Sequence, residues 1–150
     1  MEQNRVMRGR RGKGDEGAAI VEMAMVGVVL VLLLMGIMVF GYLMAFRQNL
    51  VQAATEGARA GAVAASSVTA TGDATAAAEQ AVTGFGKTCG SEGLTCLVTV
   101  GACPNAPSKN CVTVALTYDY EHHPLLPDIP VVAGALPQTI NAKAVAEVNT

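Results

Sequence analysis

Three residues at the start of the longest apolar run have the types and spacing for proteolytic maturation. Gly17 precedes Ala18, and Glu22 is the only charged residue between Gly17 and Phe46. A carboxylate in a membrane helix costs about 2.5–3.5 kcal/mol at the helix centre and less near its end, so it favours a nearby counterion. Cleavage after Gly17 would leave an amino group on Ala18, one helical turn or roughly 6 Å from Glu22. Such a cut between Gly17 and Ala18 would give the Glu22 carboxylate a counterion, and Glu22 would then recognise an amine.

A second cluster has the side chains for acid–base chemistry or metal binding. It consists of Asp119, Glu121, His122 and His123. Adjacent residues of a strand point to opposite faces, and no third group is placed to orient either histidine. We therefore interpret the cluster as a solvated turn and expect no catalytic residue, no metal ligand and no cofactor. Since the chain also lacks the phosphate-loop, G-x-S-x-G and H-E-x-x-H motifs, we expect that it is not an enzyme.

Four cysteines have the chemistry to form two disulfides. They are Cys89, Cys96, Cys103 and Cys111, and their spacing is too wide for zinc knuckles. An even number in an exported segment favours disulfides over the alternative of four free buried thiols. Of the three possible connectivities, strand parity disfavours joining Cys96 to Cys111. We favour Cys89–Cys96 together with Cys103–Cys111.

The residues around Gly17 resemble those of a known family. The matching features are the basic pair Arg10 and Arg11, the G-x-x-x-x-E junction from Gly17 to Glu22, one apolar helix and an alanine-rich extension at residues 53–62. The junction resembles the processing site of type IV pilin-like proteins. The neighbourhood is most similar to TadE-like minor pilins or pseudopilins of tight-adherence (Flp-type) pili, from which Met23 and Val28 depart.

The resemblance implies a function and a set of partners. A prepilin peptidase would cut after Gly17, and Glu22 would face the methylated amino terminus of a neighbouring subunit. The partners implied are that peptidase, other pilin subunits and the inner-membrane platform of pilus assembly. The protein would be assembled into, or prime, a pilus used in surface attachment or secretion.

Charge and hydropathy predict a single-pass membrane protein surrounded by lipid. Residues 23–46 carry no charge, and as a helix they would extend roughly 36 Å, enough to cross a hydrocarbon core of about 30 Å. Residues 1–17 contain five basic and three acidic residues, whereas the rest contains five basic and nine acidic residues. This asymmetry favours a cytoplasmic N-terminus and an exported C-terminal part. The resemblance implies that the protein lies in the inner membrane and then in the extracellular pilus after assembly.

The elements that position these residues can be predicted from periodicity. The apolar helix continues beyond Phe46, residues 66–72 form a loop, and Asp73 caps a short helix over 74–83. Residues 94–100, 112–118 and 139–148 alternate between apolar and polar side chains, as in an antiparallel sheet covered on one face. The first two strands form a hairpin, and the third follows a proline-rich connection over 123–137.

These elements make an α+β fold in which a long N-terminal helix lies across a small antiparallel sheet. We expect three parts, namely a leader at residues 1–17 that is removed, a transmembrane and assembly helix at 18–46, and an exported pilin-like domain at 47–150. Gly57 and Gly61 allow close approach either by another subunit or by the chain's own domain. We favour the second interpretation, since small-residue spacing is a weak signal for association.

A different class of function stays open from the sequence. The chain can be an uncleaved single-pass protein whose exported domain binds a partner. Nucleic acid is not an expected partner, because only three lysines, at positions 87, 109 and 143, follow Arg59, and no aromatic residue is adjacent to any of them in the sequence.

Overall fold

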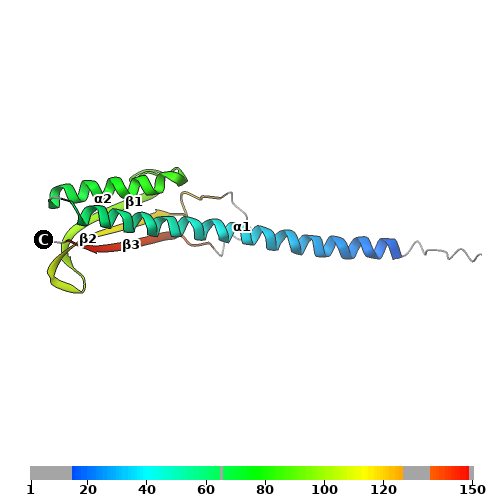
Figure 1. Cartoon of the computed structure of the whole chain (residues 1–150). Coiled ribbons are helices and arrows are strands. Elements are labelled where there is room, and N and C mark those ends of the chain that lie inside the picture. Colours follow the sequence, from blue (N-terminus) through cyan, green and yellow to red (C-terminus); the bar gives the residue numbers. More distant parts are fainter. Residues whose placement is uncertain (1–14, 65, 127–135, 149–150) are drawn as a thin grey trace, which may run out of the picture. The chain divides into compact units, whose positions relative to one another are not determined.

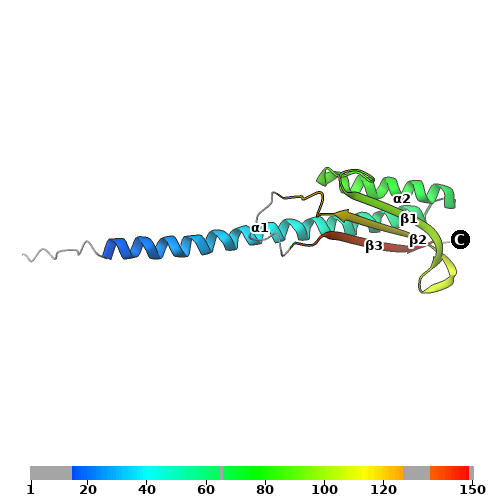
Figure 2. The ribbon, with the colours of Figure 1, turned by 180° about the vertical axis from the view of Figure 1, so that it is seen from behind.

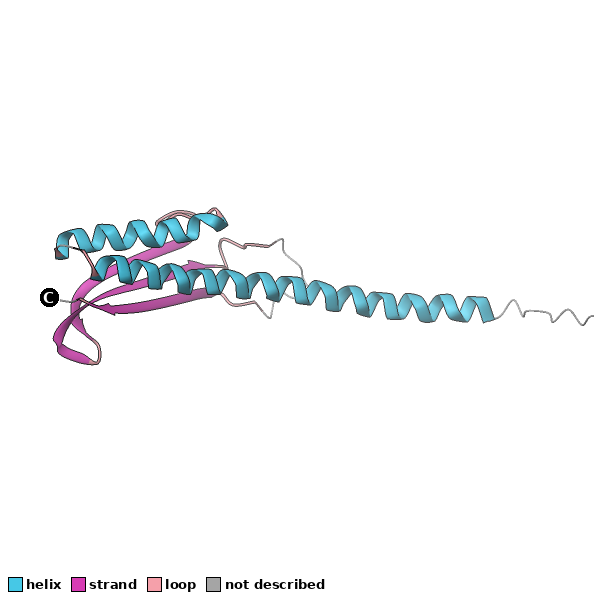
Figure 3. Ribbon diagram, viewed as in Figure 1, coloured by secondary structure: helices cyan, strands magenta, loops and turns pink. Residues whose placement is uncertain are grey.

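The computed structural model describes residues 15–64, 66–126 and 136–148. Its elements are the helices α1 (Asp15–Ala62) and α2 (Ser67–Val82), a short 3-10 helix η1 (Thr83–Phe85), and the strands β1 (Leu94–Cys103), β2 (Ala106–Asp119) and β3 (Thr139–Glu147) (Figures 1 and 3). The predicted α+β class is confirmed. Residues 1–14 of the predicted leader and residues 127–135 of the predicted proline-rich connection lie outside the described residues.

The chain divides into two compact units at Met38 and Val39. In the first unit the described residues belong to α1, and nearly every residue from Ala18 to Met38 is exposed. Among the described residues, α1 is the one helix long and apolar enough to cross a membrane, from Gly17 onwards. A helix that is apolar all round is typical of a membrane span or of a helix covered by other protein.

The second unit contains the folded head. Its sheet has the order β1-β2-β3, and both neighbouring pairs are antiparallel. The C-terminal part of α1 and α2 lie side by side in both views of the ribbon, next to this sheet (Figures 1 and 2). The second unit is therefore a sheet with helices packed on one face.

The strand register places the predicted inward residues in rows. Leu94 lies opposite Tyr118, which lies opposite Ile140, and the next row joins Cys96, Leu116 and Ala142. Leu94, Leu116, Tyr118, Ile140 and Ala142 are all buried. A one-residue slip would turn every one of these side chains to the other face, so burial of this face determines the register.

Helix α1 contributes the largest side chains on the helical side of this core. Phe46 and Leu50 are completely buried, and the Phe46 ring meets the rings of Tyr118 and Phe85 edge-on at 4.9 and 5.4 Å between centroids. Complete burial of such a side chain contributes about 1.5–3 kcal/mol. Val39 and Leu43 are also buried, so part of the predicted transmembrane helix lies in the core of the head. The predicted boundary at residues 46 and 47 stays a prediction.

Two glycines let α1 approach its neighbours closely. A Cβ on Gly57 would lie 2.8 Å from the Ala74 carbonyl oxygen, and one on Gly61 would lie 2.8 Å from Val112 Cγ1 and 3.0 Å from the Ala70 carbonyl oxygen. Both glycines therefore contact α2, and Gly61 also contacts β2. The interpretation that this pair packs within its own domain is confirmed.

Helix α2 begins earlier than predicted. Ser66 is its N-cap, and a capping box joins the Ser66 hydroxyl to the Thr69 amide and the Thr69 hydroxyl to the Ser66 amide. The predicted loop at 66–72 and the predicted cap at Asp73 are thus wrong, because residues 67–73 are helical. Burial of Ala70, one turn before Ala74 and Ala78, outweighs the low helix propensity of this segment.

The first two strands are also longer than predicted. β1 and β2 extend to Cys103 and Ala106, so the connection between them is a turn at residues 104 and 105 in place of the longer loop expected. The register shifts between Ala102 and Cys103. Such an irregularity bends a hairpin and increases its local twist.

Candidate functional site

The residues of the predicted processing junction lie in the first turns of α1. Gly17, Ala18 and Glu22 are all helical and exposed, and a Cβ on Gly17 would meet no atom within 4 Å. Ala18 and Glu22 are four residues apart, so they lie on the same side of the helix. In a mature chain that begins at Ala18, the new amino group and the Glu22 carboxylate would be neighbours on one surface.

Glu22 has no ionic partner within the described part of the chain. The ion pairs found there join Arg59 to Glu56, Lys87 to Glu92, Lys109 to Glu147 and His122 to Asp119. Each of the other acidic groups in these pairs lies outside the long apolar run. In a low-dielectric surrounding the Glu22 carboxylate would be costly without a partner, and such a partner would have to come from outside the described contacts.

Glu22 stands at the head of an apolar strip along α1 that the sequence reasoning did not identify. Behind it the strip consists of Met25, Val26, Val29, Leu30 and Leu33. These positions follow Glu22 at alternating steps of three and one, which is the spacing of one helix face. The same spacing is visible in the sequence, but the uniformly apolar surroundings conceal it. The strip is suited to packing against another apolar helix.

The cysteines lie far along the chain from this junction, in the second unit. The bonds are Cys89–Cys96 and Cys103–Cys111, with Cα–Cα distances of 5.4 and 4.9 Å, which is the connectivity that the sequence favoured. The second bond ties the far end of the β1–β2 hairpin, where Cys103 and Cys111 are both buried. A disulfide typically contributes about 2–4 kcal/mol, largely by restricting the unfolded chain.

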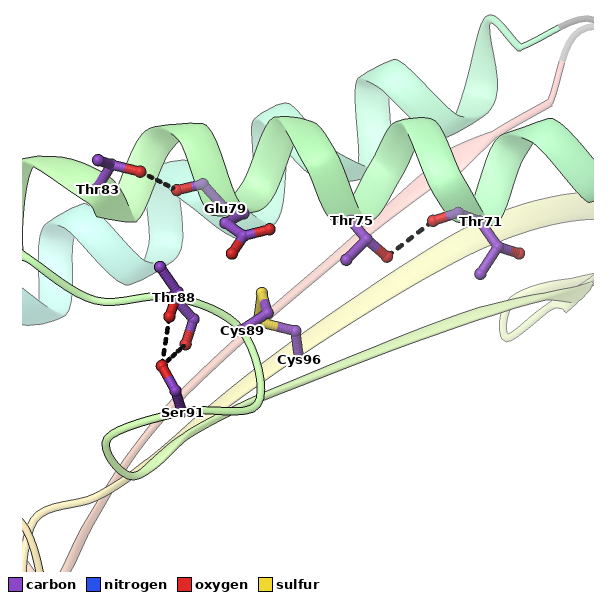
Figure 4. The surroundings of a disulfide bond; sticks show 8 residues. All are labelled: Thr71, Thr75, Glu79, Thr83, Thr88, Cys89, Ser91 and Cys96. Atoms are coloured by element: carbon purple, nitrogen blue, oxygen red, sulfur yellow. Dashed lines mark hydrogen bonds between the residues drawn. A yellow bond between two sulfur atoms is a disulfide. The ribbon is translucent and has the colours of Figure 1, made fainter.

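The first disulfide closes the segment that leads from η1 into β1. Figure 4 shows it below α2, beside a turn in which the hydroxyls of Thr88 and Ser91 are hydrogen-bonded. Lys87 Nζ lies 3.1 Å from Glu92 Oε2 and 5.4 Å from the centre of the Tyr118 ring. Burial lowers the pKa of Lys87, but hydrogen bonds with Glu92 and Tyr118 outweigh this effect and raise it overall. The segment is held by covalent, ionic and aromatic contacts.

The second predicted cluster forms a turn after β2. Asp119 Oδ2 lies 2.8 Å from His122 Nδ1, and Asp119 Oδ1 accepts a hydrogen bond from the His122 amide. The hydrogen bond between the two side chains lowers the pKa of Asp119 and raises that of His122. The neighbouring His123 ring instead packs on Gly93, and the Tyr118 hydroxyl donates to the His123 carbonyl. The expectation that no group orients either histidine is therefore wrong for His122, because Asp119 holds its ring, whereas His123 has other partners.

One segment of α1 matches the model of a known protein family. Residues 17–59 match the family model described as TadE-like protein. This segment of the chain is TadE-like. No curated protein and no solved structure matches the chain. The match is consistent with a TadE-like protein of the tight-adherence pilus system, as the sequence resemblance implied.

The TadE-like segment contains the whole junction and most of α1. It begins at Gly17 and extends to Arg59, so it includes the apolar strip, Phe46 and Gly57. The match of this segment suggests association with other pilus components, and the long apolar helix fits membrane anchoring. The sheet and both disulfides lie outside the matched segment.

Proposed function

We propose that this TadE-like chain is a minor pilin or pseudopilin, cut after Gly17 by a prepilin peptidase and assembled into, or priming, a tight-adherence pilus. We propose that such a pilus is used in surface attachment or secretion. The observation that carries this proposal is Glu22, an exposed carboxylate at the head of the apolar strip without an ionic partner in the described chain. The family match over residues 17–59 supports it.

In the proposed mechanism, Glu22 selects its neighbour through charge. Removal of the leader exposes a charged amino group on Ala18, and the Glu22 carboxylate of one subunit binds the amine of the next. This pairing is worth most in lipid, where either charge alone would be costly. The apolar strip behind Glu22 then packs on the neighbouring helix, and the inner-membrane assembly platform moves the paired helices out of the bilayer.

The bilayer segment in this proposal is shorter than the whole apolar run. Val39, Leu43 and Phe46 are buried in the head, which leaves residues 18–38 with exposed apolar side chains. A helix over that range extends about 31 Å, close to the roughly 30 Å of a hydrocarbon core. We propose a single pass with the basic leader in the cytoplasm and the disulfide-bonded head in the exported, oxidising compartment.

The test is a matched pair of carboxylate substitutions on one helix. Glu22→Ala removes the proposed recognition group, whereas Glu56→Ala removes an exposed carboxylate that forms only a 3.9 Å ion pair with Arg59. Both variants should insert in membranes and be cut after Gly17. Only Glu22→Ala should lose co-purification with sheared pili or with other pilins. Equal recovery of the two variants in the pilus fraction would contradict the proposed role of Glu22 in assembly.

The second candidate function is an uncleaved single-pass protein whose exported head binds a partner. The position of Gly17 favours it, because the Gly17–Ala18 bond lies inside α1 and a peptidase must unwind that turn. Mass spectrometry of the membrane-extracted protein decides between the two. A chain that starts at Ala18 with one added methyl group supports the pilin, whereas a chain that still starts at Met1 beside active peptidase supports the alternative.

A further inference from the structure

The head has a half-open pocket of about 310 Å³ beside the first turns of its helix. One wall is apolar and comes from α1, where Phe40, Leu43 and Met44 line it. Thr139 and Asn141, both exposed, line the facing wall at the start of β3. The volume is at the lower end of the roughly 300–1,000 Å³ of small-molecule sites. Pro137 and the buried Ile140 also line the β3 side, so the pocket is mainly apolar and Thr139 and Asn141 add hydrogen-bonding groups to it.

Arg47 lines the same pocket and is the first charged residue after Glu22. Its side chain is exposed and forms no ion pair with any described carboxylate. No acidic residue is among the described residues that line the pocket. An arginine next to apolar surface keeps its stem on that surface and its guanidinium toward an anion, and guanidinium binds phosphate through two parallel hydrogen bonds.

We propose that this pocket binds one anionic phospholipid of the exported leaflet. The phosphate would accept hydrogen bonds from Arg47, and the side chains of Thr139 and Asn141 would contact the headgroup. The acyl chains would lie on Phe40 and Met44, which remain 44% and 53% exposed in the structure. The inference depends on the membrane anchoring and the exported head proposed above.

The site matches the sequence position at which a lipid interface is expected. Phe40 follows the last residue of the first unit by two positions, and Tyr42 is 37% exposed next to the pocket residues. Aromatic and basic side chains at the end of an apolar span are typical of the headgroup level of a bilayer. An arginine at a membrane interface can bind headgroups without a pocket. Arg47 instead lines a pocket together with residues of α1 and β3.

The chain has no tryptophan, so a single introduced tryptophan is a specific probe. Phe40→Trp reports on the pocket, and Leu30→Trp reports on the exposed apolar surface of the first unit. Each full-length variant in detergent micelles is titrated with phosphatidylglycerol or phosphatidylcholine brominated near the acyl carbonyl. Phosphatidylglycerol should quench Phe40→Trp at about fivefold lower lipid content than phosphatidylcholine, as one basic contact predicts. Leu30→Trp should not distinguish the two lipids.

Two arginine substitutions in the Phe40→Trp background complete the test. Arg47→Gln should remove the preference for the anionic lipid, whereas Arg59→Gln, which changes the other arginine of α1, should retain it. Equal quenching by both lipids, or a preference that survives Arg47→Gln, would overturn the site. A change in emission that follows protein concentration and ignores lipid would instead show that a second copy covers the pocket, and would overturn it too.

The same titration separates this inference from the proposed function. If Leu30→Trp is quenched by both lipids without any preference at Phe40→Trp, only the lipid site fails. If neither tryptophan is quenched, membrane anchoring fails together with the lipid site. Pilus incorporation of Glu22 variants is measured independently of either result.

Discussion

Both ends of helix α1 contain large apolar side chains and glycines, but the surroundings of these residues differ. Leu33 in the first unit is 58% exposed, whereas Phe46 in the second is completely buried by the sheet and by η1. The glycines follow the same division, since a Cβ on Gly36 would meet nothing and one on Gly61 would meet α2 and β2. The apolar side chains at one end of the helix are covered by the chain's own head. The other end is exposed and fits membrane anchoring.

Substitutions in the two units should therefore affect different properties of the protein. In the second unit a lost contact changes the stability of the head, because the partner is present in the same chain. In the first unit the same type of substitution should leave the head stable and change insertion or assembly. The following experiments use the full-length protein in detergent, with tyrosine fluorescence as the probe of the head, because Tyr118 and Tyr120 are buried there.

The largest expected effect comes from the aromatic centre of the core. Phe46→Ala should lower the free energy of unfolding by about 3–5 kcal/mol, because it removes a fully buried ring and leaves a cavity. Leu33→Ala on the same helix should leave the denaturation midpoint of the head unchanged. Equal losses in the two variants would mean that the two parts of the helix do not differ as described.

The disulfide at the end of the hairpin should have the next largest effect. Cys103→Ser combined with Cys111→Ser should lower the free energy of unfolding by about 2–4 kcal/mol, because the unfolded chain regains the freedom of the closed loop. Chemical denaturation with and without reductant measures it. Reductant should not destabilise the double variant through this loop, so any remaining sensitivity belongs to Cys89–Cys96.

Filling a close contact of α1 should have a smaller effect on the stability of the head. A matched glycine substitution in open space should change the stability in the opposite direction. Gly57→Ala should destabilise the head by about 1–3 kcal/mol, because the new methyl would press on the Ala74 carbonyl. Gly72→Ala adds the same methyl in open space on α2 and should stabilise the head by about 0.5–1 kcal/mol. A stabilising Gly57→Ala would show that the helices separate more easily than their contacts imply.

The smallest expected effect is a pH dependence from the Asp119–His122 pair. The raised pKa of His122 gives stability that is present below its ordinary value of 6.5 and is lost as pH rises through the folded-state value. The lowered pKa of Asp119 gives stability that is present above 3.8 and is lost as pH falls through the folded-state value. The melting temperature of the unchanged protein should therefore exceed that of His122→Gln most between pH 3.8 and pH 6.5. The two melting temperatures should converge above the folded-state pKa of His122.

Periodicity alone identified most of the fold. Alternation over the three strands predicted which side chains share the apolar face, and Leu94, Tyr118 and Ile140, which form one row across the sheet, all belong to these sets. The long uncharged run predicted the candidate membrane helix, and Gly17 with Glu22 predicted the segment that matches the TadE-like model. These features are local or repeat at short intervals, so residues near in sequence are sufficient to define them.

Other features depend on contacts between distant segments. The start of α2 at Ser67 depends on alanines that fit against Gly57 and Gly61, and composition alone favoured a loop there. The burial of Val39 and Phe46 depends on the sheet, although their own surroundings in the sequence are those of a membrane span. An apolar side chain has the same local pattern whether lipid or protein covers it. Only the folded chain therefore distinguishes the part of α1 that the head covers from the part that remains exposed.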